Sequence, residues 1–104
     1  MLPKEMFLEV WNKVNGVHLG KMFGADCLRA SNGKVVAIYW QESMLFKLDE
    51  ETRLKALEIQ SATPATHLYA KDRAMRGWVN IPFTSSEHWE SLTIKAIAQS
   101  SQRH

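Results

Sequence analysis

Apolar residues recur at helical spacing in three parts of the chain. Residues 3–14 carry one stripe, made of Met6, Phe7, Val10, Trp11 and Val14, and spacings of three and four residues place such positions on one face of a helix. Residues 50–59 follow Asp49, which suits a helix N-cap. Residues 85–99 follow Thr84-Ser85-Ser86-Glu87, which has the pattern of a capping box. The pattern therefore predicts three helices.

The segments between these helices alternate as strands do. Residues 17–30 form a strand region broken near Gly20-Lys21, in which Gly24 is expected at a bulge or a close backbone approach. Asn32-Gly33 predicts a two-residue type I′ hairpin turn. In that register the expected pairs are Ala30–Val35, Leu28–Ala37 and Cys27–Ile38, with Cys27 on one face with Val36, Ile38 and Trp40.

Three more strands follow around the second helix. Residues 44–48 follow a loop over residues 41–43 and place Met44, Phe46 and Leu48 on one face. Residues 66–70 and 75–81 predict a hairpin across the loop 71–74.

The predicted order is helix, three strands, helix, two strands, helix. Short hairpin connections imply antiparallel neighbours, so we expect a two-layer α+β fold. Its five-stranded antiparallel sheet would carry the helices mainly on one face. The length of 104 residues suits one domain over residues 1–104.

Composition excludes few function classes. The net charge is only +2, which does not by itself indicate nucleic-acid binding. Cys27 is the one cysteine, so an intramolecular disulfide is impossible and a reducing compartment is favoured. The longest apolar run, residues 35–40, is far below the ~20 residues that span a bilayer, and no secretory signal precedes it. We therefore expect a soluble, cytoplasmic protein without a membrane partner.

Four short motifs occur in a characteristic order. They are Lys21-Met22-Phe23-Gly24, the Asn32-Gly33 turn, the segment 45–50 (Leu-Phe-Lys-Leu-Asp-Glu) and the segment 75–79 (Met-Arg-Gly-Trp-Val). In this order they resemble the N-terminal domain of the TfoX (Sxy) competence-regulator family, over residues 18–98. The matching motif positions are Met22, Phe23, Gly24, Gly33, Met75, Gly77 and Trp78. The chain departs from the family at residues 25–27, where a further glycine often follows.

The resemblance implies a five-stranded α+β domain similar in outline to secretion chaperones. It also implies a regulatory, non-enzymatic role without catalytic residues or cofactors. In full-length regulators this domain is joined to a helical domain and helps to switch on DNA-uptake genes. That second domain is not expected in a chain of this length, so the competence role is not carried over whole.

Candidate catalytic and metal-binding residues are few. Cys27 could act as a nucleophile with His18 or Asp26 as base, but its register favours a small core residue. The histidines are His18, His67, His88 and His104, and none has a zinc-ligand spacing to another histidine or to the cysteine. We expect neither a catalytic site nor a metal site.

Basic and aromatic residues gather around the second hairpin. Lys71, Arg73 and Arg76 lie near Tyr69 and Trp78, a mixture that can bind single-stranded nucleic acid. A solvated hairpin tip with Trp78 in the core is the favoured alternative, because the whole-chain charge is small.

The four tryptophans have two interpretations. Trp11 and Trp89 lie on apolar helical stripes and suit the core. Trp40 and Trp78 lie on strands and would mark a partner or dimer surface if the sheet had an uncovered face. Gly77 is expected to let another group pack closely over its strand.

Our first functional hypothesis is a regulatory or adaptor module that acts through contact with a protein partner or a second copy. Its candidate contact residues are Trp40, Tyr69, Lys71, Arg73, Arg76 and Trp78. The alternative is a nucleic-acid-binding module that uses the basic and aromatic hairpin over residues 71–78. No small-molecule substrate is identified.

Overall fold

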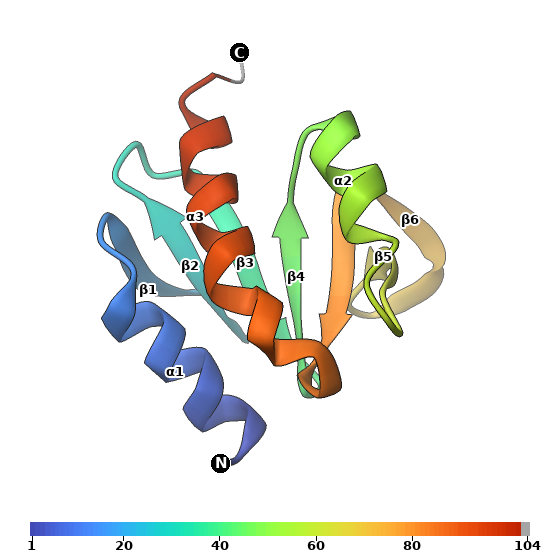
Figure 1. Ribbon diagram of the computed structural model, residues 1–104, viewed down its shortest axis with the longest axis horizontal. Coiled ribbons are helices and arrows are strands. Elements are labelled where there is room, and N and C mark those ends of the chain that lie inside the picture. The colour runs from blue at the N-terminus through green and yellow to red at the C-terminus, as the bar shows by residue number, and fades with distance from the viewer. Residues whose placement is uncertain (103–104) are drawn as a thin grey trace.

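The computed structural model describes residues 1–102 and contains one antiparallel sheet with helices packed on it (Figure 1). Its elements are α1 (Pro3–Lys13), β1 (Val17–Met22), β2 (Ala25–Ala30), β3 (Val35–Trp40), β4 (Ser43–Lys47), α2 (Glu50–Ala56), β5 (Thr63–His67), β6 (Ala70–Pro82), the 3₁₀ helix η1 (Phe83–His88) and α3 (Trp89–Ser100). The strands lie in the order β1-β2-β3-β4-β6-β5, and all neighbours are antiparallel. No helix among the described residues is long and apolar enough to cross a membrane.

The sheet has six strands, so the prediction of five and their order was wrong in detail. The extra strand arises at Phe23-Gly24, where both backbones have positive φ angles, 54° and 81°. Two successive positive φ angles are the signature of a type I′ turn. This turn pairs Met22 with Ala25 and divides the predicted strand region into β1 and β2. The α+β class itself is confirmed.

The turn at Asn32-Gly33 differs from the predicted type I′ turn. Only Gly33 has a positive φ, and the Ala30 N–H donates to the Lys34 carbonyl. The loop therefore has three residues, and the expected Ala30–Val35 pair is wrong. An extra residue in β3, Val36, compensates for this shift, so the predicted pairs Leu28–Ala37 and Cys27–Ile38 do form.

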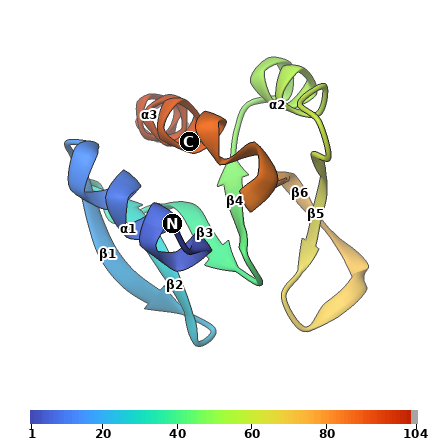
Figure 2. The same ribbon diagram turned by 60° about the horizontal axis from the view of Figure 1, so that its bottom comes forward.

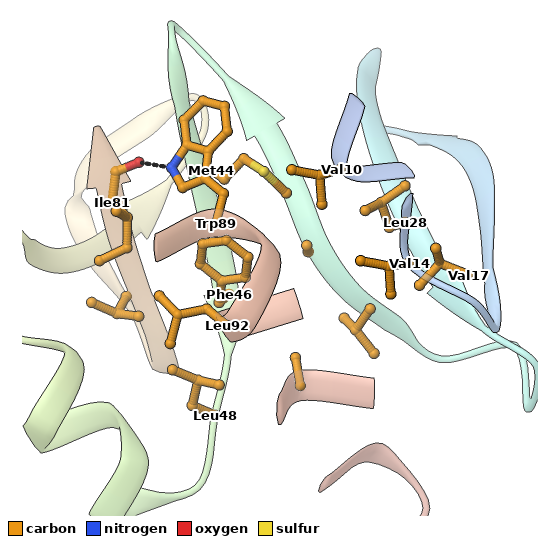
Figure 3. Close-up of a cluster of buried hydrophobic side chains, with 14 of the residues drawn as sticks. Val10, Val14, Val17, Leu28, Met44, Phe46, Leu48, Ile81, Trp89 and Leu92 are labelled. Atoms are coloured by element: carbon orange, nitrogen blue, oxygen red, sulfur yellow. Dashed lines mark hydrogen bonds between the residues drawn. The ribbon is translucent and has the colours of Figure 1, made fainter. Parts of the chain in front are cut away.

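The helices cover one face of the sheet (Figure 1). Phe7 and Val10 of α1, Val14 at its C-cap, and Trp89, Leu92 and Ala96 of α3 pack with strand residues in the first hydrophobic core. The Trp89 indole N–H donates to the Ile81 carbonyl at 3.0 Å, so its one polar atom is satisfied within the core (Figure 3). Met44, Phe46 and Leu48 all face this core, as predicted.

The other face holds a second hydrophobic core that contains no helical residue. Its buried members come from the strands and from the turn between β5 and β6: Ala25, Cys27, Ile38, Leu45, Ala65, Leu68 and Trp78. Leu68, in that turn, shares this core with Ala25 and Cys27 of β2, although β2 and β5 lie far apart in the strand order, which requires the sheet to curl. Figure 2 shows this curl, with the β1–β2 turn and the β5–β6 turn extending toward the same side. The helix-free face is thus covered by the sheet itself.

Several further boundaries differ from prediction. The hairpin turn lies at Leu68-Tyr69, because residues 71–74 belong to β6 and oppose β5 through an irregular register. Ser43 belongs to β4. Val36 packs in the first core, whereas Cys27 and Ile38 pack in the second. Thr84 caps no helix, since neither η1 nor α3 has a side-chain cap.

Candidate functional site

The β1–β2 turn, at Phe23-Gly24, and the β5–β6 turn, at Leu68-Tyr69, meet at one end of the sheet. The Tyr69 hydroxyl donates to the Phe23 carbonyl at 2.6 Å, which joins residues 46 positions apart in the sequence. The Tyr69 ring also meets Trp40 edge to face, with ring centroids 5.3 Å apart, and the His67 ring lies 5.8 Å from the Phe23 ring. We call Phe23, Trp40, His67 and Tyr69 the aromatic end.

The aromatic end is largely open to solvent. Phe23 is 59% exposed and Tyr69 is 65% exposed, whereas Trp40 and His67 are half-buried. Large apolar side chains at such exposure, clustered rather than scattered, are typical of contact surfaces. The contact of Tyr69 and His67 with Phe23 was not predicted from the sequence.

Phe23 occupies a backbone conformation that phenylalanine avoids. Its φ is 54°, in the left-handed region, where the Cβ of an L-residue approaches the following carbonyl oxygen. A positive φ for a bulky residue is a genuine outlier. Asparagine or glycine would suit this turn position better.

The predicted contact residues on β6 are not brought into one surface. Trp78 is only 8% exposed and packs in the second core, so its ring cannot stack on a partner. Lys71 lines a pocket with Trp40 and His67. Arg76 lines a different depression with Glu50 and Arg53. Arg73 is exposed on β6.

Cys27 is fully buried in the second core, on the helix-free face. Burial raises the pKa of its thiol, because the thiolate would lose hydration. Such surroundings are those of an inert structural cysteine.

Asp26 is engaged elsewhere as an ion-pair partner. It accepts from the Lys21 ammonium at 2.7 Å and from Lys4 at 3.2 Å. The Lys21 hydrogen bond is the main reason that the pKa of Asp26 lies below its ordinary value, and burial partly opposes this effect. Asp26 is therefore held as a carboxylate that fastens α1 to β2.

No group of three or more histidine, cysteine or acidic side chains that could hold a metal occurs within residues 1–102. His18 is exposed, His67 belongs to the aromatic end and His88 precedes α3. His104 lies outside the described residues.

The residues of the sequence motifs lie in the second core and at the turns. Met22 and Met75 pack at the margin of the second core, and Trp78 lies within it. Phe23-Gly24, Gly33 and Gly77 all supply positive φ angles, at two turns and in irregular β6. The two motifs around Gly24 and Gly77 therefore help to shape the curled sheet.

Comparison of the chain with protein-family models, with curated proteins and with solved structures gives no match. The resemblance to the TfoX N-terminal domain therefore stays a prediction.

Proposed function

We propose that this chain is a small regulatory or adaptor module that acts through protein–protein contact at its aromatic end. The observation that carries the proposal is Phe23, which is both strained in its backbone and exposed in its side chain. A strained residue persists only where the surrounding structure fixes it, and such residues cluster at functional sites.

The position of Phe23 has no sufficient structural explanation. Its side chain is 59% exposed, so it contributes little burial. Its carbonyl accepts the Tyr69 hydroxyl, a bond that any residue at this position could make. The phenyl ring is thus best explained as an anchor for a partner, since aromatic side chains dominate interface hot spots.

The surroundings of Phe23 suit a preorganised contact surface. The Tyr69 hydroxyl joins the two turns through the backbone carbonyl of Phe23, so the ring is presented from a fixed hairpin rather than from a free loop. Rigid aromatic anchors bind at a low cost in conformational entropy. A regulatory, non-enzymatic role is also what the family resemblance implies.

The test replaces Phe23 by asparagine. Asparagine adopts positive φ readily and precedes glycine in preferred type I′ turns. We expect the free energy of unfolding to stay equal or to rise by about 1 kcal/mol. Binding should nevertheless be lost, as measured by light scattering for self-association and by affinity capture with quantitative mass spectrometry for separate partners.

The matched control is Leu54→Gln, which removes another exposed apolar side chain, on α2. It should leave both readouts unchanged. If Phe23→Asn folds and still captures the same partner or forms the same oligomer as the wild type, the aromatic end is not the contact surface.

A second candidate is nucleic-acid binding, favoured by the neighbouring Tyr69 and Lys71 at the end of the sheet. Base stacking on Tyr69 with phosphate contact at Lys71 would give an affinity that falls steeply with salt. A fluorescent single-stranded oligonucleotide titrated at low and high salt separates the two functions. Salt-dependent binding that Arg73→Ala and Lys71→Ala reduce would favour this candidate over protein contact.

A further inference from the structure

A pocket of about 340 Å³ lies between the β3–β4 hairpin and the β5–β6 hairpin, on the helix-free side of the sheet. Leu45 of β4 pairs with Asn80 of β6, and Asn80 pairs with Thr63 of β5. These three residues and Ser43 line the pocket across neighbouring strands. Trp40, Leu68, His67 and Lys71 also line it. Its volume is at the lower end of the range for small-molecule sites.

Polar groups in this pocket have unused hydrogen-bonding capacity. Ser43 is only 9% exposed and Asn80 is half-buried. Among the described residues, neither side chain is found hydrogen-bonded to another protein group, and neither holds a buried unsatisfied polar atom, so their polar atoms reach the pocket surface. Most of the lining residues are polar, and Trp40, Leu45 and Leu68 supply its apolar part. Convergent polar groups beside an apolar surface fix the orientation of a small ligand.

The charge of the pocket is positive. Lys71 forms no ion pair with a described residue, and no aspartate or glutamate lines the pocket. His67 Nδ1 accepts from the Tyr69 N–H at 3.3 Å, so a neutral His67 carries its ring proton on Nε2 as a further donor. A pocket with one ammonium group and neutral hydrogen-bond donors suits a ligand with a single negative charge better than a ligand with two.

We propose that this pocket binds a small aromatic carboxylate, with the ring against Trp40 and the carboxylate toward Lys71. The aromatic ring gains contact with the indole, and the carboxylate accepts from Lys71 and from neutral donors such as the Asn80 amide. The pocket shares Trp40 and His67 with the aromatic end, but Phe23 and Tyr69 do not line it, so substitution of Phe23 distinguishes the two proposals.

The test uses three probes of matched chemistry. These are 2-naphthoate, the neutral 2-naphthylmethanol with the same rings, and acetate, which has the charge without the rings. Each is titrated into the full chain and followed by ¹H–¹⁵N correlation spectra, with the Trp40 indole and Asn80 amide signals as reporters. We expect 2-naphthoate to shift both signals with a Kd of about 1 mM or tighter, and the other two probes to bind more weakly.

Two lysine variants test the charge recognition. Lys71→Gln should raise the Kd for 2-naphthoate about fivefold and leave the Kd for 2-naphthylmethanol unchanged. Lys95→Gln, an exposed lysine on α3, should change neither. Phe23→Asn should also leave 2-naphthoate affinity unchanged, which separates this site from the proposed protein contact.

Three results would overturn the proposal. The first is no shift of the Trp40 and Asn80 signals at millimolar 2-naphthoate. The second is equal affinity for 2-naphthoate and 2-naphthylmethanol, and the third is equal affinity of Lys71→Gln and the wild type for 2-naphthoate.

Discussion

Gly77 has a φ of 82°, which no neighbouring group imposes by crowding. A Cβ built at this position would have the Leu48 carbonyl oxygen as its nearest neighbour, 3.7 Å away, an ordinary contact. The expectation that another group packs closely over Gly77 is therefore wrong. The glycine is needed because β6 makes its irregular pairing with β5 here and the Leu48 N–H donates to the Gly77 carbonyl.

This explanation predicts that, at Gly77, the larger substitution destabilises the protein less than the smaller one. Gly77→Ala should lower the free energy of unfolding by about 1–2 kcal/mol, because alanine resists the left-handed region. Gly77→Asn should lower it less, although asparagine is larger, because asparagine tolerates positive φ. Urea unfolding of both variants measures the difference.

Gly20→Ala is the control, since Gly20 has no positive φ and its added Cβ would lie 3.4 Å from the Arg29 side chain. Gly20→Ala should lower the free energy of unfolding less than Gly77→Ala does. If Gly77→Asn lowered the free energy of unfolding more than Gly77→Ala does, crowding at this position would explain the glycine better than its backbone conformation.

Residue-level predictions succeeded where one residue type has one dominant role. Asp49 caps α2 by accepting from the Thr52 N–H, and Pro3 occupies the first turn of α1, both as expected. The Phe23-Gly24 turn was not predicted, because phenylalanine carries no turn preference and only Gly24 indicated an irregularity.

At the scale of elements, α1 is attached to the sheet by an ion-pair cluster as well as by its apolar stripe. Lys4 of α1 and Lys21 of β1 both contact the Asp26 carboxylate of β2, whose side chain is only 13% exposed. Both lysines are more than half exposed, so solvent screening limits the strength of each pair.

Asp26 should make stability sensitive to acid. Its pKa is lower in the folded protein than in the unfolded chain, so its contribution is present above the ordinary carboxyl pKa and is lost as pH falls through the folded value. Asp26→Asn should therefore cost about 1 kcal/mol at pH 7 and less at pH 3. Urea unfolding at the two pH values measures this.

Glu9→Gln serves as the control, because the one ion pair of Glu9 within residues 1–102 is with exposed Lys13 at 3.5 Å. It should cost less than about 0.5 kcal/mol. An equal cost of Asp26→Asn at both pH values would mean that the charge of Asp26 contributes nothing.

Elements were predicted correctly where the residues that determine them lie within the element itself. The helices α1 and α3 were found from their apolar stripes, and α2 was found mainly from its Asp49 cap. The predicted ranges 50–59 and 85–99 were wrong at their ends, since α2 ends at Ala56 and α3 begins at Trp89, after the 3₁₀ helix η1. The β5–β6 turn was misplaced, because the polar run 71–74 has the composition of a turn while Leu68-Tyr69 does not. The position of that turn depends on the contacts of Tyr69 with Trp40 and Phe23 and on the burial of Leu68 in the second core, all of which involve residues far away in sequence.

At the scale of the whole molecule, the sheet curls until its helix-free face is enclosed. The alternation of apolar residues predicted which residues share a face, but not that two faces would both be buried. Curvature depends on irregular β6, on Gly77 and on the Tyr69–Phe23 hydrogen bond together. This enclosure also removes Trp78 from the predicted contact surface and creates the pocket beside Trp40.

Loosening the curl should expose the second core. Tyr69→Phe removes the hydroxyl that bonds the Phe23 carbonyl and should cost about 1 kcal/mol. Cys27 reports this opening, because it is fully buried in the second core and can react only after the sheet opens. Its labelling should therefore be faster in Tyr69→Phe than in the wild type.

The most direct test of the enclosed sheet is the labelling rate of Cys27 in the native wild-type protein, followed with Ellman's reagent at neutral pH and compared with the rate in concentrated urea. The curled sheet predicts native labelling that is slower than unfolded labelling by at least about a hundredfold. Native labelling as fast as that of the unfolded chain would show that the helix-free face is open, and would contradict the second core on which this account depends.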